Sequence, residues 1–355
     1  MQSFISGVIE RQSIPQSLLQ TIRLLGEYKG KQALYKNQSP QVLETLQQVA
    51  IIQSTESSNR IEGIATAPQR LQLLMTDKIK PQSRSEQEIL GYREVLNTIH
   101  ANYDGMLFTP GLVLQLHRDL TQFLPAQGGV WKGSDNDIRE TLADGTELIR
   151  FRPVPAYLTP QAMQDLHERF NRAWENETIE PLLLIATYCL DFLCIHPFSD
   201  GNGRMSRLLS LALLYQAGYE VGRYISLEAI VEGTKESYYD TLHRCSQGWH
   251  ESSHELIPWW EYFLGTVLSA YREFEDRVGV VTSKKGAKQD MVLDAIARLP
   301  MQFQVAEIQK ACPTVSRPTI HRVLASLKQS GQIHCIKGGR DAIWEKLERP
   351  SNQES

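Results

Sequence analysis

Helix-type spacing of apolar residues runs through most of this chain and limits what it can fold into. From Ser17 to Tyr271, apolar residues recur three and four positions apart, as in Ile89 to Ile99 and Met163 to Trp174. This spacing places them on one face of an α-helix. Strand signals are few, so we predict a mainly α fold for this part of the chain.

The main exception is the segment Gly128 to Pro153. Within it, Val130-Trp131, Leu148-Ile149 and Phe151 flank the dipeptide Asp144-Gly145, which favours a tight turn between two strands. We predict a short β-hairpin here, inserted into the helical domain.

The C-terminal part has a different composition and charge. The helical pattern ends near Val278, and residues 279–289 lose the apolar pattern and carry Ser283, Lys284, Lys285, Gly286 and Lys288, as a solvated linker does. From Lys284 to Lys346 there are eleven Lys or Arg and five Asp or Glu, a net charge of +6, while the whole chain carries −4. The rest of the chain is therefore at −10, and this sharp division of charge supports a separate domain.

Three helices and two strands are predicted after the linker. Helix-type spacing covers residues 291–299, 305–311 and 319–327, and the strand segments are 333–336 and 342–344, on either side of Lys337-Gly-Gly-Arg340. We interpret this order as a small winged-helix domain.

A turn between two helical runs brings together a histidine, an aspartate, two glycines and two arginines within twelve residues. The segment His196 to Arg207 reads His-Pro-Phe-Ser-Asp-Gly-Asn-Gly-Arg-Met-Ser-Arg. The Gly-Asn-Gly part can turn successive backbone N–H groups to one side, and the next helix adds the free donors of its N-terminus. Arg204 and Arg207 lie three residues apart and can hold successive phosphates. The pattern predicts a nucleotide site.

Two further residues of this segment suit a reaction on that nucleotide. Asp200 is placed to hold Mg²⁺, which uses one or two carboxylates together with phosphate oxygens and water. His196, whose ordinary pKa is near neutrality, can take the proton from an attacking hydroxyl.

The same residues fill every fixed position of the signature HxFx(D/E)GNGRxxR, so the chain resembles the Fic (Fido) domain family. That family has a helical fold, and its best-known activity is transfer of AMP from ATP to protein hydroxyls. The resemblance implies a general base, an apolar loop anchor, a Mg²⁺ ligand, and contacts to the α-, β- and γ-phosphates. In this chain these are, in that order, His196, Phe198, Asp200, Asn202, Arg204 and Arg207, with Gly201 and Gly203 contacting phosphates through their backbone.

An upstream segment is similar to an inhibitory motif of the family, (S/T)xxxE(G/N). It reads Ser58-Asn-Arg-Ile-Glu62-Gly63 and ends a predicted helix of about residues 40–62 that begins at Pro40 after Ser39 as cap. The resemblance implies that Glu62 pairs with Arg207 and keeps the γ-phosphate of ATP from its place. The alternative role left open for Glu62 is to support removal of AMP.

The resemblance also assigns two surfaces of the site. A hairpin upstream of the signature binds an extended target segment by strand addition in the family, and Gly129 to Pro153 fits it by position. Tyr238 and Tyr239 lie where related sequences line the adenine pocket. The competing interpretation of Gly129 to Pro153 is an ordinary surface hairpin. The competing interpretation of Tyr238 and Tyr239 is a role in the core.

The predicted organisation follows from these segments. It comprises an N-terminal helical region (1–105), the Fic catalytic core (106–278), the linker (279–289), the winged helix (290–346) and a tail (347–355). The basic balance of the winged helix, with Arg317, His321 and Arg322 near the start of its third helix, predicts contact with DNA, and a protein-contact role is the alternative.

The function expected is therefore ATP- and Mg²⁺-dependent transfer of AMP to a Tyr, Ser or Thr hydroxyl of a target protein, restrained by Glu62. The alternatives are a nucleotide-sensing DNA-binding regulator, AMP removal, or transfer of another nucleotidyl or phosphate group. Self-modification and a homodimer are left open. The five scattered cysteines, the lack of a signal peptide pattern and the lack of a long apolar stretch predict a cytoplasmic protein without a membrane segment.

Overall fold

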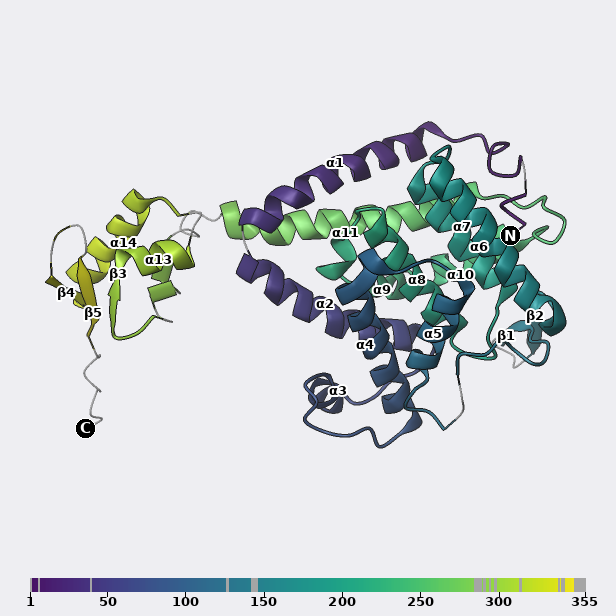
Figure 1. Cartoon of the computed structure of the whole chain (residues 1–355), viewed down its shortest axis with the longest axis horizontal. Coiled ribbons are helices and arrows are strands. Elements are labelled where there is room, and N and C mark those ends of the chain that lie inside the picture. Colours follow the sequence, from purple (N-terminus) through teal and green to yellow (C-terminus); the bar gives the residue numbers. More distant parts are fainter. Residues whose placement is uncertain are drawn as a thin grey trace. The chain divides into compact units, whose positions relative to one another are not determined.

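The computed structural model divides the chain into two compact units, residues 1–274 and 275–355 (Figure 1). It describes residues 2–347 except 6, 39, 126–127, 142–145, 284–288, 290–291, 294, 297–298, 313–314, 338 and 340–341. The predicted cap Ser39, the predicted turn Asp144-Gly145 and the tail from 348 onward lie outside the described residues.

The first unit is helical, as the spacing predicts, with one small sheet. No helix in the described part of the chain is both long and apolar enough to cross a bilayer. Its elements, together with α11, which runs past the boundary, are α1 (Gln16–Gln38), α2 (Pro40–Ile61), α3 (Pro68–Met75), α4 (Arg84–Asn102), η1 (Tyr103–Gly105), α5 (Pro110–Leu120), β1 (Ile138–Thr141), β2 (Glu147–Phe151), η2 (Ala156–Leu158), α6 (Thr159–Asn176), α7 (Pro181–Ile195), α8 (Asn202–Gln216), η3 (Val221–Arg223), α9 (Leu227–Gly233), α10 (Lys235–Ser246) and α11 (Ile257–Ser283).

Helix α7 is the centre of this unit. Every residue from Leu182 to Ile195 is buried, as expected for a helix that is apolar on all sides. Pro181 occupies the first turn, where its missing N–H costs nothing. The polar Asp191 is buried too, and it accepts hydrogen bonds from the backbone N–H of Ser3 at 3.2 Å and from Trp249 Nε1 at 2.6 Å. The N-terminal segment is thereby tied to the core.

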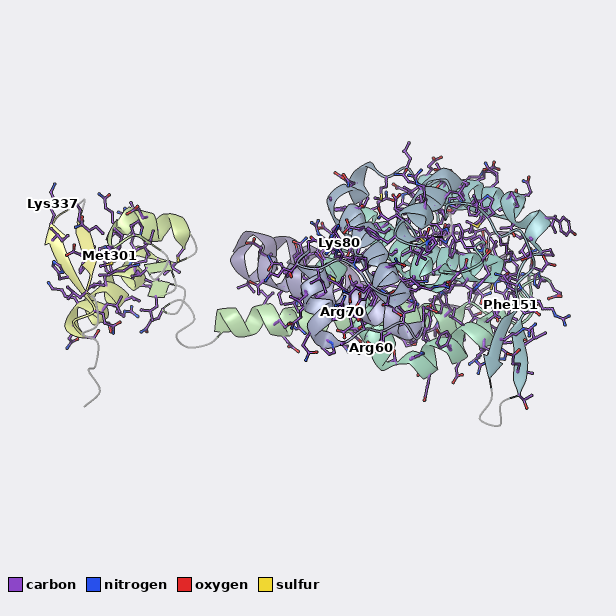
Figure 2. All side chains as sticks on the ribbon, turned by 90° about the horizontal axis from the view of Figure 1, so that it is seen from below. Arg60, Arg70, Lys80, Phe151, Met301 and Lys337 are labelled. Atoms are coloured by element: carbon purple, nitrogen blue, oxygen red, sulfur yellow. The ribbon has the colours of Figure 1, made fainter. Side chains whose placement is uncertain are left out.

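Helices α6 and α8 pack against α7, and α2 packs against α4 and α9. The α2 contacts are partly polar, because Ser54 donates to the buried carboxylate of Glu228 at 2.7 Å and Lys235 donates to the Ile61 carbonyl at 2.6 Å. Arg60, visible on the surface in Figure 2, adds an exposed ion pair with Glu232 at 3.0 Å. These contacts hold the C-terminal end of α2 beside α9 and α10.

The predicted hairpin is present, but its first strand begins later than predicted. Strands β1 and β2 pair antiparallel, with Ile138 opposite Phe151 and Thr141 opposite Glu147. Val130 and Trp131 lie before the sheet in an irregular segment. Trp131 packs near Phe198 instead, with ring centroids 5.3 Å apart. That contact explains why these apolar residues are not in the strand.

Helix α11 runs on to Ser283, past the predicted helix end near Val278. Residues 279–283 have no apolar pattern, which is why the sequence places them in the linker, but a helix whose preceding turns are packed can continue at small cost. Its N-terminal part is buried through Trp259 and Trp260, whose indole N–H groups donate to Ala186 O and Thr187 Oγ1.

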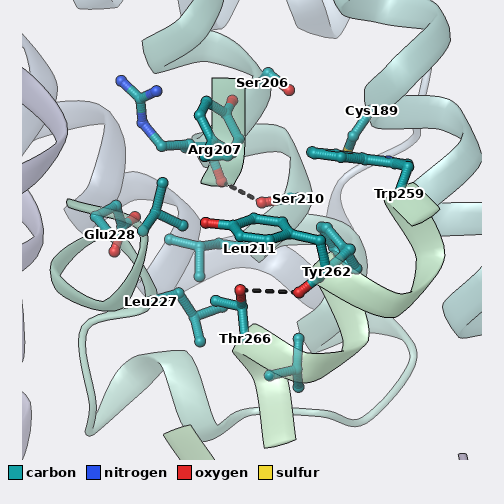
Figure 3. A pocket seen from close by; sticks show the side chains of 14 residues that line it. Cys189, Ser206, Arg207, Ser210, Leu211, Leu227, Glu228, Trp259, Tyr262 and Thr266 are labelled. Atoms are coloured by element: carbon teal, nitrogen blue, oxygen red, sulfur yellow. Dashed lines mark hydrogen bonds between the residues drawn. The ribbon is translucent and has the colours of Figure 1, made fainter. Parts of the chain in front are cut away.

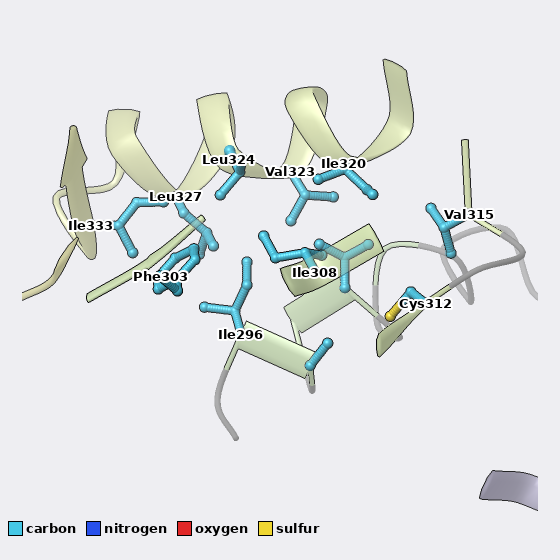
Figure 4. Packing of buried hydrophobic residues seen from close by; sticks show 12 residues of the cluster. Ile296, Phe303, Ile308, Cys312, Val315, Ile320, Val323, Leu324, Leu327 and Ile333 are labelled. Carbon is cyan, nitrogen blue, oxygen red and sulfur yellow. The ribbon is translucent and has the colours of Figure 1, made fainter. Parts of the chain in front are cut away.

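The second unit has an apolar core of its own, which Figure 4 shows between α14 and the elements facing it. Its described elements are β3 (Gln302–Gln304), α13 (Val305–Ala311), α14 (Arg317–Gln329), β4 (Ile333–Lys337) and β5 (Ile343–Lys346), with a sheet in the order β3-β5-β4. The sequence analysis missed β3, because three residues give no alternating pattern. The first predicted helix, 291–299, lies partly outside the described residues, and the winged-helix interpretation stays a prediction.

Candidate active site

Two residues in the left-handed backbone region form the turn between α7 and α8. His196 ends α7 with φ 51° and ψ 61°, and Gly201 precedes α8 with φ 82°. Glycine adopts this region freely, whereas histidine does so at a cost. The turn brings the imidazole and the N-terminus of α8 to one place, so the sequence prediction of a helix–loop–helix turn is correct.

The ring of His196 is held in one orientation. Its Nδ1 lies 3.2 Å from the Leu193 carbonyl oxygen, so Nδ1 carries the proton in this contact and Nε2 keeps its lone pair. Burial lowers the pKa of His196 to about 4. At neutral pH the ring is therefore uncharged and able to accept a proton at Nε2.

Phe198 anchors the loop through a stack that the sequence analysis did not predict. It is fully buried and lies parallel to the His117 ring, with centroids 3.6 Å apart. His117 Nδ1 accepts from the Gly129 N–H at 3.0 Å, and Nε2 donates to the Asp200 carbonyl at 3.1 Å. Burial lowers the pKa of His117 to about 4, so it stays neutral in this bridging tautomer. His117, from α5, thus ties the loop at Asp200 to the segment that begins at Gly129.

Lys132 braces the other side of the loop. Its backbone N–H donates to the Pro197 carbonyl at 2.8 Å, and its buried ammonium donates to Ile195 O at 3.2 Å and Asn136 Oδ1 at 2.7 Å. Burial lowers the pKa of Lys132 to about 8. Asn136 in turn donates to the Phe198 carbonyl at 3.1 Å. The segment before β1 therefore shapes the loop.

Asn202 has a contact different from the one that the resemblance implies. Its side-chain oxygen accepts from the Phe198 N–H at 2.9 Å, and its amide nitrogen donates to the Phe198 carbonyl at 2.7 Å. The side chain is buried and closes the loop across four residues. In this arrangement it shapes the phosphate cradle, and any phosphate contact falls to its backbone N–H.

Arg207 contacts the end of α2, and Glu62, which the resemblance pairs with it, is among its partners. Its Nη2 lies 2.8 Å from Glu62 Oε1 and 2.8 Å from the Ser58 carbonyl oxygen, and its Nε donates to Ser58 Oγ at 2.9 Å. Burial opposes the charge on this guanidinium, but the Glu62 carboxylate raises its pKa overall. The third nitrogen, Nη1, is buried without a partner in the structure.

Glu62 also covers the glycine cradle. A Cβ placed on Gly203 would collide with the Glu62 carboxylate, so that carboxylate lies directly over the backbone that the sequence assigns to phosphate. Gly63 follows with φ 79°, a conformation that suits glycine at a helix end. The described geometry places an anionic side chain where an anionic ligand is expected.

Asp200 is open to solvent, with 66% of its side chain exposed. It is a lone carboxylate, since no cluster of three or more His, Cys, Asp or Glu side chains suited to a metal occurs among the described residues. Mg²⁺ bound with a nucleotide needs only one or two carboxylates, because phosphate oxygens and water supply its other ligands. The residues present therefore fit the predicted Mg²⁺.

A groove of about 920 Å³ opens over the catalytic turn. Its wall includes His196, Gly203 and Glu62. The hairpin of β1 and β2, called the flap from here on, contributes residues of both strands, among them Phe151 (Figure 2). Both Tyr238 and Tyr239 line it as well. Tyr238 is buried and Tyr239 is 36% exposed. The residues assigned to catalysis, inhibition, adenine contact and target binding thus share one groove.

A second cavity lies behind Arg207 and is too small for a nucleotide. It has about 40 Å³ and is lined mainly by α8, α9 and α11 (Figure 3). Ser210 donates to the Arg207 carbonyl at 2.7 Å beside it. The space can hold a water molecule, and it does not compete with the groove as the nucleotide site.

Three residues that touch the predicted site were missed by the sequence analysis. His117 lies far from the signature in sequence and carries no motif. Lys132 lies inside the predicted hairpin segment Gly129 to Pro153, but it was given no role of its own. Glu88, on α4, accepts from Arg204 Nη1 at 2.8 Å. Its only sequence signal is its spacing from Arg84, four residues earlier on the same helix, which favours an ion pair.

The fold and the turn define a class: a helical domain in which a helix N-terminus lies beside a half-buried histidine. Comparison with known proteins adds the family. Residues 107–214 match the model described as the Fic/DOC family, a range that includes the flap, α7, the signature and most of α8. Residues 107–214 are therefore similar to the Fic/DOC family.

Relatives with established names share part of this chain. It is 27% identical over 213 residues to "Protein adenylyltransferase Fic" of Culex quinquefasciatus, covering 58% of this chain and 39% of that protein. It is 31% identical over 134 residues to the protein of the same name from Drosophila melanogaster, covering 37% and 25%. The chain spans less than half the length of these relatives.

Solved structures share the fold. A Fic family protein from Desulfovibrio desulfuricans superposes with a TM-score of 0.64 at 18% identity, covering 96% of this chain and 98% of that one. Fic-1 from C. elegans superposes with a TM-score of 0.58 at 16% identity, covering 76% and 74%. This likeness confirms the predicted helical Fic fold.

Proposed function

We propose that this protein transfers AMP from ATP to a Tyr, Ser or Thr hydroxyl of a target protein, and that Glu62 restrains the reaction by pairing with Arg207. One observation carries the proposal. His196, the Gly203 cradle and the Glu62 carboxylate line one groove large enough for a nucleotide, and Glu62 pairs with Arg207 at 2.8 Å. The names of the relatives support the group transferred.

The reaction follows from the orientation of His196. Its Nε2 accepts the proton of the target hydroxyl, and the oxygen attacks the α-phosphorus of ATP. The new oxygen–phosphorus bond forms as the bond to the β-phosphate oxygen breaks, and pyrophosphate leaves. The protein contributes positioning and charge: backbone N–H groups at Gly201 to Gly203, and the guanidinium groups of Arg204 and Arg207, which the resemblance assigns to the β- and γ-phosphates.

Mg²⁺ would be held by Asp200 and would neutralise charge on the phosphates. The Asp200 carboxylate reaches into solvent at the N-terminus of α8, and the hydrogen bond from His117 to its carbonyl keeps its backbone in place. This chain therefore presents the ligand on a rigid loop.

The proposed brake acts by occupying Arg207 and the cradle together. With Glu62 in place, Arg207 makes two hydrogen bonds to Ser58 in α2 and one to Glu62, the residue after α2. A γ-phosphate then has no access to Arg207 Nη2. A phosphate over Gly203 would also meet the Glu62 carboxylate. ATP binding in a reactive position then requires that Glu62 move away, which α2 resists through its contacts with α9 and α10.

The flap is proposed to hold the target. Strands β1 and β2 form a two-stranded sheet with residues on the groove, and an extended target segment could add to its edge by main-chain pairing. The groove then places the target hydroxyl near His196.

The test is transfer of label from α-³²P-ATP with Mg²⁺ to cell-lysate proteins and to the protein itself. We compare wild type, Glu62→Gly, and Glu62→Gly with His196→Ala. Label should be weak in wild type, strong in the single variant and absent in the double variant. Label on the protein itself identifies self-modification. ATP binding without label in any form contradicts AMP transfer and favours another donor, and release of AMP from a labelled target would assign the removal reaction.

A second candidate function concerns the C-terminal unit, and the exposed face of α14 favours it. The helix buries Ile320, Val323, Leu324 and Leu327 and exposes Arg317, His321, Arg322 and Lys328. Lys337 is exposed at the end of β4 (Figure 2). We propose that this basic face contacts DNA phosphates.

The DNA proposal is tested by fluorescence anisotropy of labelled duplex DNA with the full chain. Binding should weaken steeply with salt, and Arg322→Ala should lower both the affinity and the salt slope. Ser326→Ala, on the exposed face but uncharged, is the matched control. Absence of binding at low salt would contradict the proposal and favour a protein-contact role.

A further inference from the structure

Helix α4 contributes charged residues to the phosphate site that the signature does not contain. Glu88 lies in the second turn of α4, and only 5% of its side chain is exposed. One of its oxygens accepts from Arg84 Nε at 2.7 Å and the other from Arg204 Nη1 at 2.8 Å. Both oxygens of this buried carboxylate are thus used by arginines.

The same two arginines meet again at Asp200. Arg204 Nη2 lies 3.6 Å from Asp200 Oδ1, and Arg84 Nη2 lies 3.4 Å from Asp200 Oδ2. The four residues therefore form a closed ring of alternating charge, Arg84, Glu88, Arg204 and Asp200, which we call the four-charge ring. Two of its members belong to the signature and two to α4.

We propose that Glu88 is a positioning residue of the nucleotide site, which orients the guanidinium of Arg204 toward the β-phosphate. Arg84 pairs with the other oxygen of Glu88 and helps to hold this carboxylate in place. This inference rests on the proposed function and extends it to residues outside the signature. A guanidinium is a planar fork, so its orientation decides which oxygens it can reach. Arg204 Nε is buried without a partner in the structure, and Glu88 is the closest anchor of its Nη1, since Asn59 Oδ1 lies 3.5 Å away.

The Glu88 side chain is expected to keep its position when a nucleotide binds. Leaving its place would strip charge-assisted hydrogen bonds from two arginines at once, inside a helix whose neighbours Ile89 and Leu90 are buried. Such bonds are strong where water is excluded, as at Arg204, which has 4% of its side chain exposed. Arg84 has 72% of its side chain exposed, so its pair with Glu88 contributes less. Glu88 therefore acts on bound nucleotide through Arg204 rather than by direct contact.

The consequence is a specific affinity pattern. A residue that orients the β-phosphate arginine affects nucleotides that have a second phosphate, and leaves nucleotides with one phosphate nearly untouched. General damage to the fold would weaken both classes alike. The comparison of ADP with AMP therefore separates positioning from structural support.

The experiment measures the Kd of ADP and of AMP with Mg²⁺ by calorimetry in the Glu62→Gly protein, where the groove is open. Adding Glu88→Gln should weaken ADP binding at least about tenfold, as expected for one misplaced charge-assisted hydrogen bond, and AMP binding less than about twofold. Glu94→Gln is the matched control, because Glu94 lies on the same helix and pairs with Arg93 away from the site. It should change neither value.

A double-mutant cycle with Arg204→Ala completes the test. If Glu88 acts through Arg204, adding Glu88→Gln to Arg204→Ala should weaken ADP binding no further. Equal losses for ADP and AMP, or independent losses from the two substitutions, would overturn the inference. Should Glu88→Gln fail to fold, Glu88→Asp keeps the charge, withdraws it by one methylene, and should show the same ADP-selective loss. A Glu62→Gly protein that binds no nucleotide contradicts the proposed function instead.

Discussion

Arg204 and Arg207 lie three residues apart on α8, and each meets one glutamate, but the two ion pairs are built differently. Glu88 sits inside α4, has 5% of its side chain exposed and uses both oxygens. Glu62 follows the last turn of α2, has 30% of its side chain exposed, and pairs with Arg207 through one oxygen. The same pair of residue types therefore forms a fixed support in one case and a displaceable cover in the other.

The difference teaches that burial and the place of the carboxylate on its helix decide the role of an ion pair. Removing one partner of a buried pair leaves an uncompensated charge. A carboxylate at a helix end can move with a small change in backbone, particularly when a glycine such as Gly63 follows it. We expect opposite results when the two glutamates are substituted.

The largest expected effect is on stability. Glu88→Gln leaves Arg204 buried beside a neutral partner, and we expect the free energy of unfolding to fall by about 3–5 kcal/mol. Glu62→Gln should cost about 1 kcal/mol, because that pair is partly solvated and Ser58 still holds Arg207. Urea denaturation of the two variants measures both values. Similar losses from the two would remove the distinction between support and cover.

The next effect is on activity. Glu62→Gly should raise the rate of AMP transfer at least about tenfold, because Arg207 and the Gly203 cradle become available to the nucleotide; tenfold corresponds to about 1.4 kcal/mol. Glu62→Gln tests whether the charge alone is responsible. Labelling with α-³²P-ATP gives the rates, and Glu44→Gln, at an exposed position of the same helix away from Glu62, serves as control. An unchanged rate in Glu62→Gly would falsify the brake.

The pH dependence is measured in Glu62→Gly, so that protonation of Glu62 cannot contribute. Burial lowers the pKa of His196 to about 4, and only the neutral ring accepts a proton. Transfer activity should be level across neutral pH and be lost as the pH falls through about 4, approaching tenfold per pH unit below it. A loss centred near pH 6.5 would mean that the ring is solvated during the reaction.

The smallest effect is expected at Ser58. Its hydroxyl accepts from Arg207 Nε at 2.9 Å, and one such bond contributes about 0.5–1.5 kcal/mol. Ser58→Ala should therefore raise the transfer rate by less than about tenfold, well below Glu62→Gly. Ser57→Ala, at the neighbouring position on α2, is the control. A rate in Ser58→Ala equal to that of Glu62→Gly would place the main restraint in the hydroxyl rather than in the carboxylate.

The helical fold was predictable because local spacing alone encodes it. The apolar run from Leu182 to Ile195 forms the buried helix α7, and the apolar residues Leu148, Ile149 and Phe151 lie in strand β2. The start of β1 was not predictable in the same way. Trp131 has strand character, but the tertiary contact with Phe198 keeps it out of the sheet, and no local pattern reports such a contact.

The site residues also divide into those that a local sequence pattern predicts and those that only the fold brings to the site. The signature from His196 to Arg207 and the segment Ser58 to Gly63 were found because they are contiguous. Their contact at 2.8 Å was expected from the family resemblance. His117, Lys132 and Glu88 were missed because each reaches the site from another helix or loop, and only the fold brings them there.

The left-handed backbone at His196 has a consequence for how such a chain changes over time. A non-glycine residue in this region costs about 1–3 kcal/mol, and here the residue that bears the cost is the proposed base. Drift under selection for folding alone would favour glycine or asparagine at this position. If His196 is the proposed base, selection for AMP transfer retains the imidazole. Homologues that lose the activity should then replace His196 early and gain stability.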